Sequence, residues 1–386
     1  MLAGLKTLKD FDFKNKVVLV RADLNVPVNE KGEILNDFRI KSSLPTIREL
    51  FRKGASQVIL MSHLGRPKNK EKHLRMNEVA KKILKLTGRK VEKIDDFDEI
   101  PHPAKASLLV LENLRFFEEE TKNDDEFAKK LASLADIYVN DAFGVCHRAH
   151  ASVHAITKHI PGCVGLLVEK ELEAFDFLNN PKRPFSAVLG GSKLETKIPI
   201  IQNLLNKVDN LLLGGGMIFT FYDAKKLEVG KSIVDKNQRA MAKMLLNNEK
   251  LILPTDVIIA DDANLPTSVL AVDVDKIPSY MIGLDIGKRS LNNYAKILSE
   301  SKTVVWNGPL GYYETKDFAR ATVELLKFLA SRTDIKVIIG GGDTASIVED
   351  LGLINEFYHV STGGGASLKL LEGNTLTAIE ALKNNN

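Results

Sequence analysis

The 386-residue sequence has little cysteine and few aromatic residues: two cysteines, one tryptophan, and 6% aromatic residues in all. Two cysteines cannot form the disulfide framework of a small secreted domain. No apolar run approaches the roughly 18 residues that a membrane span requires. The N-terminal stretch MLAGLKTLKDF lacks the apolar segment and the cleavage pattern of a signal peptide. We therefore expect a cytoplasmic protein with no membrane partner.

A large excess of charge of one sign is also missing, because the formal net charge is only +4. Dedicated nucleic-acid binders concentrate far more basic charge, so nucleic acid is not an expected partner. The composition, 44% hydrophobic and 27% charged, is that of a globular protein. A chain of this length exceeds one ordinary core, which predicts two domains.

Short apolar runs alternate with helical patterns in the first half of the chain. The runs are 17–20, 58–61, 108–111 and 137–139, and one helical pattern spans 124–135. Strands that alternate with helices predict an α/β fold with a parallel sheet. In such sheets ligands bind at the carboxyl ends of the strands.

Polar side chains follow each of these predicted strands. They are Asp23, Asn25, His63, Arg66, Arg115 and Arg148, and Arg39 precedes a helical stretch. A single loop arginine is most often a solvated surface charge. Several at equivalent strand ends favour a ligand site, because guanidinium groups bind phosphate and carboxylate bidentately. The pattern predicts a small, highly anionic substrate.

A helical pattern without a preceding strand, 165–179, separates the two halves, and the sequence NNPKRP breaks it. We place the domain boundary between Gly162 and Pro184. The prediction is an N-terminal domain 1–163, a connecting helix and hinge 164–183, and a C-terminal domain 184–373.

The stretch GGSKLETK, from Gly190 to Lys197, follows an apolar run at 185–189 and precedes a helical pattern. We expect Lys193 and Lys197 to share one face of the first helical turns. Cations are disfavoured at a helix N-terminus, so two lysines there suggest a bound anion such as phosphate. Two solvated surface lysines are the alternative.

Glycine clusters end the predicted strands of the second half: Gly214–Gly216, WNGPLG, GGGDTA and STGGGAS. Glycine lets the backbone approach a ligand, and a following helix offers free N–H groups to phosphate. Together these loops predict a nucleotide site. Asp343, directly after a tri-glycine, fits a Mg²⁺ ligand or a helix N-cap.

Other readings carry less weight. A Walker A motif is absent. A dinucleotide-binding pattern occurs at Gly340, Gly342 and Ala345 and makes an NAD-dependent oxidoreductase the runner-up, but the acidic residue that would bind the ribose is missing. A polyanion-binding module is a further alternative. Zinc binding by His147, His150 and His154, and a nucleophilic Cys146–His147 pair, are set aside.

With these residues identified, nearly the whole chain resembles the phosphoglycerate kinase family. The matching segments are RADLNVP, SHLGRP, ENLRF, FGVCHRAHAS, GGSKLETK, LLLGGGM, VVWNGPLG, GGGDTA and VSTGGGASL. The resemblance implies two doubly wound, Rossmann-like parallel-sheet domains that face each other across a cleft and are joined by a hinge helix. It also implies that the C-terminal segment 374–386 packs on the N-terminal domain.

The implied activity is that of a phosphotransferase with a carboxyl group as acceptor. Phosphate would pass reversibly between 1,3-bisphosphoglycerate and MgADP, giving 3-phosphoglycerate and MgATP, in glycolysis and gluconeogenesis. Mg²⁺ is the implied cofactor, ADP and ATP are substrates, and a monomer is expected.

The resemblance also assigns roles to residues. Those expected to act on the phosphoryl group in flight are Arg39, Lys193 and Lys197. Those expected to bind the phosphoglycerate are Asp23, Asn25, Arg39, His63, Leu64, Gly65, Arg66, Arg115 and Arg148. Those expected to bind the nucleotide are Gly190, Gly191, Lys197, Gly214, Gly215, Asn307, Pro309, Glu314, Gly340, Gly341, Gly342, Asp343, Thr344, Gly364 and Gly365, with Asp343 as the metal ligand.

Four residues depart from the family pattern. Thr196 stands where an aspartate usually precedes the second lysine, Tyr312 and Tyr313 replace a small aliphatic residue and phenylalanine, and Lys288 replaces the common proline after GLDIG. We expect Tyr312 to narrow or polarise the adenine end of the nucleotide slot.

Overall fold

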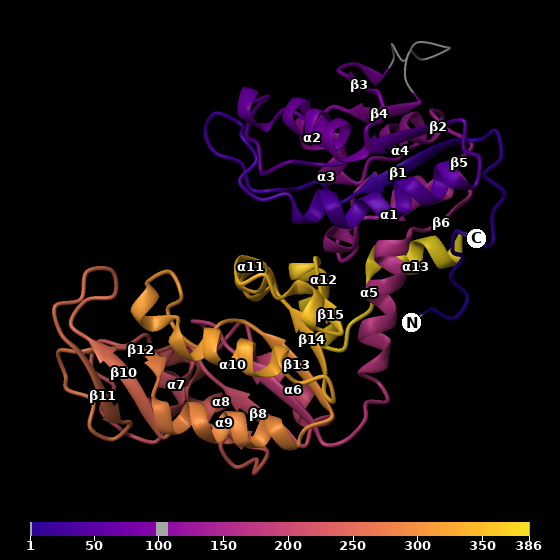
Figure 1. Cartoon of the computed structure of the whole chain (residues 1–386). Helices are drawn as coiled ribbons and strands as arrows, with labels where there is room; N and C mark the ends of the chain where they lie inside the picture. The colour runs from indigo at the N-terminus through magenta and orange to yellow at the C-terminus, as the bar shows by residue number, and fades with distance from the viewer. Residues whose placement is uncertain (1, 98–106, 386) are drawn as a thin grey trace. The chain divides into compact units, whose positions relative to one another are not determined.

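The computed structural model describes residues 2–97 and 107–385, and the chain divides into two compact units (Figure 1). Unit 1 comprises Met1–Asp176 and Thr375–Asn386, and unit 2 comprises Phe177–Asn374. The division falls within the segment 164–183.

A six-stranded parallel sheet, in the order β3-β4-β2-β1-β5-β6, forms the centre of unit 1. Its strands are β1 (Val17–Ala22), β2 (Gln57–Met61), β3 (Val91–Ile94), β4 (Leu108–Leu111), β5 (Ile137–Asp141) and β6 (Gly162–Val164). The four apolar runs predicted as strands form β1, β2, β4 and β5. Their side chains are buried almost throughout, as expected of strands covered on both faces.

Helices alternate with these strands, as predicted for an α/β fold. They are α1 (Phe38–Arg52), α2 (Asn77–Thr87), α3 (Glu118–Lys122), α4 (Asp125–Ala132), α5 (Leu166–Phe177) and α13 (Thr377–Asn384), with 3₁₀ turns η1 (Lys72–Leu74), η3 (Leu114–Phe116), η4 (Phe143–Val145) and η5 (Ala155–Lys158). The predicted helix at 124–135 is shorter than expected, because Asp124 caps α4 by accepting the N–H of Phe127, and the helix ends at Ala132.

The C-terminal helix α13 belongs to unit 1. The N–H of Ala378 donates to the carbonyl of Cys146 at 2.9 Å, and Asn385 Nδ2 donates to Thr157 Oγ1 at 2.9 Å. Ala378, Ile379 and Leu382 are buried. The last helix is therefore anchored on the loops that follow β5.

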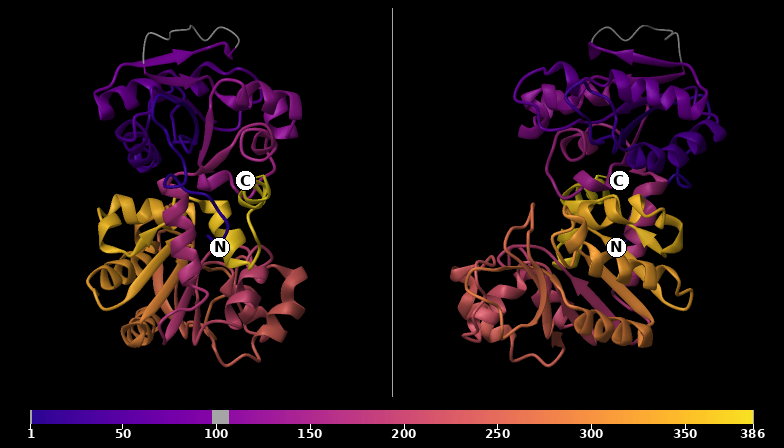
Figure 2. Two further views of the ribbon diagram at one scale, coloured as in Figure 1. Left: turned by 90° about the vertical axis from the view of Figure 1, so that its right-hand side faces the viewer. Right: turned by 60° about the vertical axis from the view of Figure 1, so that its left-hand side comes forward.

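Unit 2 contains a second six-stranded parallel sheet, in the order β15-β14-β13-β7-β8-β9, and Figure 2 shows helices on either side of it. Its strands are β7 (Phe185–Leu189), β8 (Asn210–Leu213), β9 (Leu251–Ile252), β13 (Thr303–Asn307), β14 (Lys336–Gly340) and β15 (His359–Val360). Its helices are α6 (Ile198–Leu205), α7 (Ile218–Ala224), α8 (Arg239–Leu245), α9 (Lys288–Glu300), α10 (Arg320–Ala330), α11 (Gly342–Asp350) and α12 (Gly364–Leu371), with 3₁₀ turns η6 (Lys236–Gln238), η7 (Lys316–Phe318) and η8 (Ile354–Glu356).

The predicted fold class, α/β with two parallel-sheet domains, is confirmed. The sequence analysis did not predict a further antiparallel sheet in unit 2, in the order β11-β10-β12. Its strands are β10 (Asp256–Ala260), β11 (Val269–Asp273) and β12 (Ile282–Ile286). They lead into no glycine-rich loop, which was the signal used for the other strands of this unit. Among the described residues, no helix is long and apolar enough to cross a membrane.

Candidate functional site

The predicted substrate residues of unit 1 gather at the carboxyl edge of its sheet, where the loops after β1, β2, β4 and β5 meet. Arg66, Arg115 and Arg148 line one pocket of about 750 Å³. Lys68 and Lys70 add two further cations to the lining, against one carboxylate, Glu118. The pocket is thus strongly cationic, as predicted for an anionic substrate.

The electrostatics of this pocket show an excess of cations over carboxylates. Burial, together with the neighbouring charges of Arg148, Arg21 and Arg66, lowers the pKa of Arg115 to about 10. Arg115 Nη1 donates to the carbonyl of Gly65 at 2.5 Å, which fixes the guanidinium at the pocket wall. A bound polyanion would relieve this repulsion.

His63 lies 3% exposed beside the same pocket. Burial and the charges of Arg21, Arg115, Arg39 and Arg148 hold its pKa well below the ordinary value. Its Nδ1 lies 3.0 Å from Nη2 of Arg21, and a guanidinium can only donate. His63 is therefore neutral with an unprotonated Nδ1, and its Nε2–H is available as a donor.

Arg21 is a buried residue beside this pocket that the sequence analysis did not single out. It is fully buried, and its Nε donates to Ser152 Oγ at 2.9 Å, while Ser152 donates to the buried Glu120 at 2.7 Å. Through this relay Glu120 offsets the Arg21 charge. The available signal was an arginine at the end of the otherwise apolar run VVLVRA.

Asp23, which directly follows β1, forms an ion pair with Arg39 of α1. Arg39 Nη1 donates to both carboxylate oxygens of Asp23, at 3.0 and 2.8 Å, and Asp23 is fully buried. Gly144 allows this approach, since a Cβ there would lie 2.6 Å from Asp23 Oδ2. The pair holds the Arg39 guanidinium in a defined position.

The two amides Asn25 and Asn113 order the loop after β2. Asn25 Oδ1 accepts the N–H of Gly65 at 2.8 Å. Asn113, which is fully buried and was not predicted, accepts the N–H of Leu64 at 3.1 Å and donates to its carbonyl at 2.8 Å. Leu64 is 1% exposed, so it shapes the loop rather than offering a side chain to a ligand.

In unit 2 the loops after β7, β8 and β13 pack backbone against backbone, and glycine is required for this contact. A Cβ at Gly190 would lie 1.8 Å from the Pro309 carbonyl oxygen, and one at Gly215, where φ is +69°, would lie 2.6 Å from Gly191 N. A Cβ at Gly214 would lie 2.4 Å from the Leu310 side chain. Gly190, Gly214 and Gly215 therefore have a structural role.

The glycines after β14 and β15 are less crowded than those after β7 and β8. A Cβ at Gly342 would meet no atom within 4 Å, and a Cβ at Gly364 would have its nearest atom 3.9 Å away. Gly341 is the exception, because it lies against the Asn307 amide. Gly342 begins α11 and Gly364 begins α12. These two helix N-termini leave open space at their first residues. Gly340 ends β14, and Gly365 follows Gly364 in α12.

Asn307 connects this loop to Lys197. Lys197 Nζ donates to Asn307 Oδ1 at 2.6 Å, and burial lowers the pKa of Lys197 while the charge of Asp343 opposes that shift. Asn307 is 2% exposed, and its Nδ2 has no hydrogen-bond partner among the described residues. Leaving such a donor unsatisfied costs about 1–3 kcal/mol, so an acceptor on a ligand is expected here.

The structure corrects one expectation about this half-site and decides against one of the two alternatives for Asp343. The helix predicted to include both lysines, α6, begins only at Ile198, so Lys197 is its N-cap residue and Lys193 is exposed in the preceding turn. Pro199 favours this late start, since proline suits the first helical turn. The N-cap of α11 is Gly341, not Asp343. Asp343 is exposed in the first turn and makes no hydrogen bond or ion pair with the described residues.

The remaining predicted nucleotide residues lie on neighbouring loops. The N–H of Gly308 donates to Thr344 Oγ1 at 2.8 Å, and Glu314 is exposed. Tyr312 Oη donates to Asn264 Oδ1 at 2.9 Å. Burial, Asp343 and Glu314 raise the pKa of Tyr313, which places Tyr313 near the predicted metal ligand.

The residues set aside in the sequence have other partners. His150 lies 3.8 Å from Glu120, and His154 contacts Asn123 Nδ2 at 3.1 Å. The described part of the chain contains no group of three or more His, Cys, Asp or Glu residues able to hold a metal ion. Burial raises the pKa of Cys146 to about 12, so it is an inert thiol.

Comparison with known proteins gives the family of this chain. The phosphoglycerate kinase family model matches residues 8–374. The chain belongs to the phosphoglycerate kinase family. It is 48% identical to the phosphoglycerate kinase of Nostoc punctiforme over 98% of both chains, and 47% identical to the cytosolic phosphoglycerate kinase of Triticum aestivum over 97% of both.

Solved structures of phosphoglycerate kinases have the same fold. The enzyme from Coxiella burnetii matches with a TM-score of 0.87 at 36% identity, covering 98% of this chain and 99% of that one. The enzyme from Pyrococcus horikoshii matches with a TM-score of 0.86 at 32% identity, covering 98% of both chains. The resemblance to phosphoglycerate kinases inferred from the motifs is confirmed.

Proposed function

We propose that this phosphoglycerate kinase family member transfers a phosphoryl group reversibly between 1,3-bisphosphoglycerate and ADP, giving 3-phosphoglycerate and ATP, in glycolysis and gluconeogenesis. One observation carries the proposal: unit 1 gathers Arg66, Arg115 and Arg148 in one pocket whose lining contains a single carboxylate, Glu118. Such a site suits a small molecule that carries both phosphate and carboxylate.

The unit 1 half-site would hold the substrate by its two ends. Arg66, Arg115, Arg148 and the Nε2–H of His63 would bind the phosphate that does not react. Asp23 and Asn25 would bind the hydroxyl and carboxylate end, next to Arg39. Because Asp23 already orients Arg39, the guanidinium would meet the reacting group without reorganisation.

The unit 2 half-site would hold the nucleotide. The open helix N-termini at Gly342 and Gly364, the free amide of Asn307 and the hydroxyl of Thr344 suit phosphate oxygens. Glu314 would accept the ribose hydroxyls, and Gly190, Gly191, Gly214, Gly215 and Pro309 would shape the adenine slot.

Asp343 fits the Mg²⁺ that a nucleotide substrate brings. Its carboxylate is exposed and unpaired beside the phosphate-binding loop, and Mg²⁺ in kinases takes one or two protein carboxylates besides phosphate oxygens. When bound, the ion would neutralise phosphate charge.

Lys193, Lys197 and Arg39 would then stabilise the charge on the phosphoryl group in flight, which needs positioning more than covalent chemistry. Transfer requires that the two substrates meet and that water is excluded from the acyl phosphate. We propose that the segment 164–183 is the hinge that allows this, and that one cytoplasmic monomer carries the complete activity.

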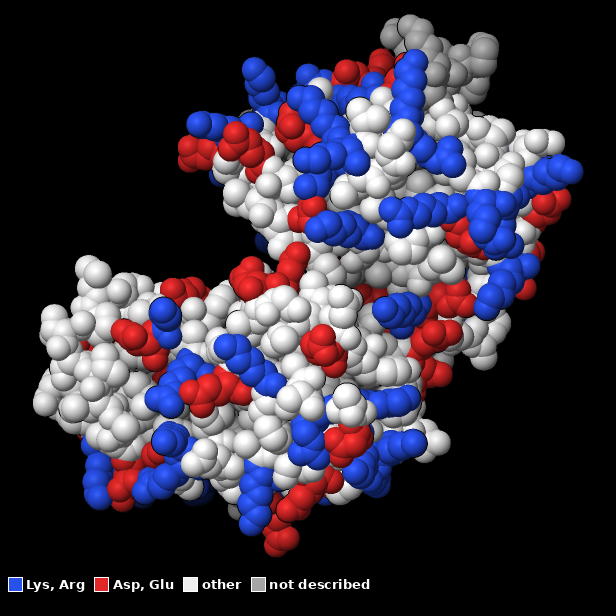
Figure 3. Space-filling model, viewed as in Figure 1, with Lys and Arg blue, Asp and Glu red and all other residues white. Residues whose placement is uncertain are grey.

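The test is a coupled assay with 3-phosphoglycerate and MgATP, in which the acyl phosphate formed is reduced with NADH. We expect turnover that needs both substrates and Mg²⁺, and the absence of turnover would overturn the proposal. A nucleic-acid-binding module would instead bind RNA with a steep salt dependence. Figure 3 argues against it, since basic and acidic side chains are interspersed on the face shown.

A further inference from the structure

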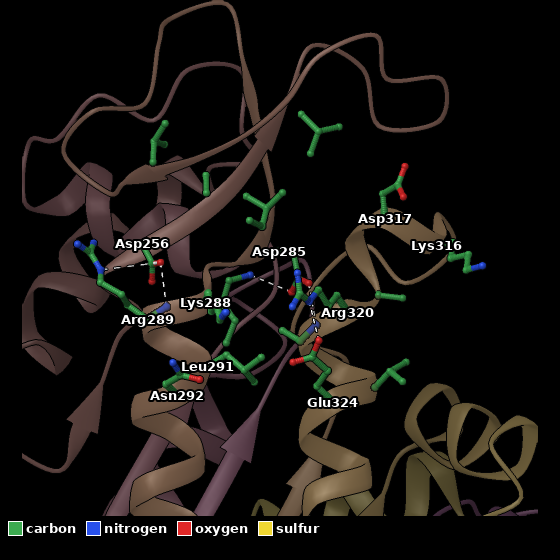
Figure 4. Close-up of a pocket in the computed structure, with 18 of the residues that line it drawn as sticks. Asp256, Asp285, Lys288, Arg289, Leu291, Asn292, Lys316, Asp317, Arg320 and Glu324 are labelled. Carbon is green, nitrogen blue, oxygen red and sulfur yellow. Dashed lines mark hydrogen bonds and ion pairs between the residues drawn. The ribbon is translucent and has the colours of Figure 1, made fainter.

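Unit 2 contains a cavity of about 1440 Å³ that the proposed reaction does not use (Figure 4). It lies between the antiparallel sheet β11-β10-β12 and the first turns of α9 and α10. No residue assigned above to the nucleotide or the phosphoglycerate lines it.

One wall of the cavity is the uncovered face of the small sheet. Side chains alternate along β10: Val257 and Ile259 are fully buried on one face, while Ile258 is only half-buried on the other. Ile258 pairs with the exposed Ala271 of β11, and Leu291 and Val323 of the two helices lie opposite. Ile258 and Ala271 therefore form an apolar surface of the cavity, which we call its floor.

The carboxylates around the cavity are almost all engaged. Asp256 accepts the N–H of Ser290 at 2.8 Å, and Asp285 accepts that of Ala321 at 3.0 Å, so they cap α9 and α10. Asp273 pairs with Lys276 and Arg289, and Glu324 with Arg320. Asp317 is the one lining carboxylate without a hydrogen bond or ion pair among the described residues.

Three lining lysines have no such partner in the described part of the chain: Lys288, Lys316 and Lys327. Lys288 is the first residue of α9, where a cation is disfavoured, and no acidic residue stands in that first turn. It is also one of the departures from the family pattern noted in the sequence. The lining thus holds three lysines without a partner against one such carboxylate, a small excess of positive charge next to an apolar surface.

We propose that this cavity binds an amphipathic organic anion, a small molecule with an apolar ring system or chain and one anionic group. The apolar part would lie on Ile258 and Ala271, and the anionic group would face Lys288. A simple phosphate would leave the floor exposed, and a neutral apolar ligand would leave the lysines unpaired.

The cavity shares no lining residue with the proposed nucleotide site, but the two are neighbours in sequence, since Lys316 and Asp317 of the lining follow Glu314 in the same loop. Asp285, which lines the cavity, also lies close to Gly311 of that loop. The test therefore has to show whether a nucleotide and the anion bind independently.

The probe is 8-anilinonaphthalene-1-sulfonate, titrated into the full chain by fluorescence, once without nucleotide and once with MgADP at saturation. Lys288→Glu should weaken its binding about fivefold, since one surface charge contributes roughly 1 kcal/mol. Glutamate suits a helix N-terminus, so this variant should fold normally. Binding of the uncharged analogue N-phenyl-1-naphthylamine should be unchanged.

A second variant tests the floor. Ala271→Glu places a charge on the exposed sheet face and should weaken both probes. The matched controls are Leu270→Glu, on the other face of β11, and Lys296→Glu, further along α9, and neither should weaken binding. The proposal would be overturned if MgADP displaced the sulfonate, if Lys288→Glu and Ala271→Glu bound it normally, or if the controls weakened it equally.

Discussion

Arg21 illustrates which parts of a site a sequence reveals. The positions of His63, Arg66, Arg115 and Arg148 were predictable because cationic residues that follow strands meet at one sheet edge. The protonation state of His63 was not predictable, because it depends on a contact with Arg21 that forms only when β1 and β2 pair. Partners distant in sequence determine which ring nitrogen carries the proton.

Lys197 offers the sharpest single-residue test of the proposed reaction. Lys197→Ala removes a half-buried cation bonded to Asn307 and should lower turnover about 10²–10³-fold, the effect of losing one preorganised electrostatic contact. The unfolding midpoint should change little. Lys296→Ala, on the exposed face of α9, is the control and should keep full activity. If Lys197→Ala retained more than about a third of wild-type turnover, Lys197 would have no part in the mechanism.

The arginines of unit 1 should divide into two kinetic classes. Arg115 and Arg148 would bind a phosphate present throughout the reaction, so Arg115→Ala or Arg148→Ala should raise KM for 3-phosphoglycerate more than it lowers kcat. Arg39 would touch the group in flight, so Arg39→Ala should mainly lower kcat. Steady-state kinetics of the three variants decides the matter, and the reverse ordering would refute the assignment of roles.

At the level of elements, a sequence reveals glycine-rich loops, but it does not show which glycines allow backbone packing and which leave space for a ligand. Gly190 and Gly342 both follow a parallel strand, yet one touches the Pro309 backbone and the other faces open space. Such differences depend on how the loops after β7 and β13 meet. The antiparallel sheet was missed for a related reason. Its strands pair across the loops 261–268 and 274–281, and none of them is followed by the glycine-rich loop that marked the other strands.

This difference predicts opposite effects of the same substitution. Gly190→Ala places a Cβ 1.8 Å from a carbonyl oxygen and should lower the free energy of unfolding by about 1–3 kcal/mol. Gly342→Ala should leave stability unchanged or raise it by up to about 1 kcal/mol, since alanine favours a helix, but should weaken MgADP binding. Denaturant unfolding and calorimetry measure the two effects. Normal MgADP affinity in Gly342→Ala would remove this residue from the nucleotide site.

At the scale of the whole molecule, buried titratable groups are distributed unequally between the two units. Unit 1 holds His63, whose pKa lies well below its ordinary value, and His150, with a pKa lowered to about 4, both because of burial and neighbouring arginines. It also holds Asp141, whose pKa burial raises to about 7. Unit 2 holds Asp285, whose pKa burial also raises to about 7.

These shifts give the two units opposite responses to acid. Below pH 6.5, the ordinary histidine value, unfolding of unit 1 takes up protons on His63, His150 and His154, whose pKa values are all lowered in the folded protein, and releases one from Asp141. Its stability should therefore fall on acidification, by at least about 1.4 kcal/mol per pH unit. Unfolding of unit 2 releases the proton of Asp285, so its stability should rise by a similar amount as the pH falls. Both slopes apply down to about pH 5, above the range where carboxylates of the unfolded chain titrate.

Hydrogen exchange measured by mass spectrometry at pH 6.5 and at about pH 5 tests this expectation, once exchange rates are corrected for the intrinsic effect of pH. Peptides from β1, β2 and β5 should lose protection at the lower pH relative to peptides from β7, β13 and β14. The comparison is internal, because both units experience the same buffer and the same exchange chemistry. Equal changes in the two sheets would mean that the histidines of unit 1 are protonated in the folded protein, and the neutral His63 that donates through Nε2 would have to be abandoned.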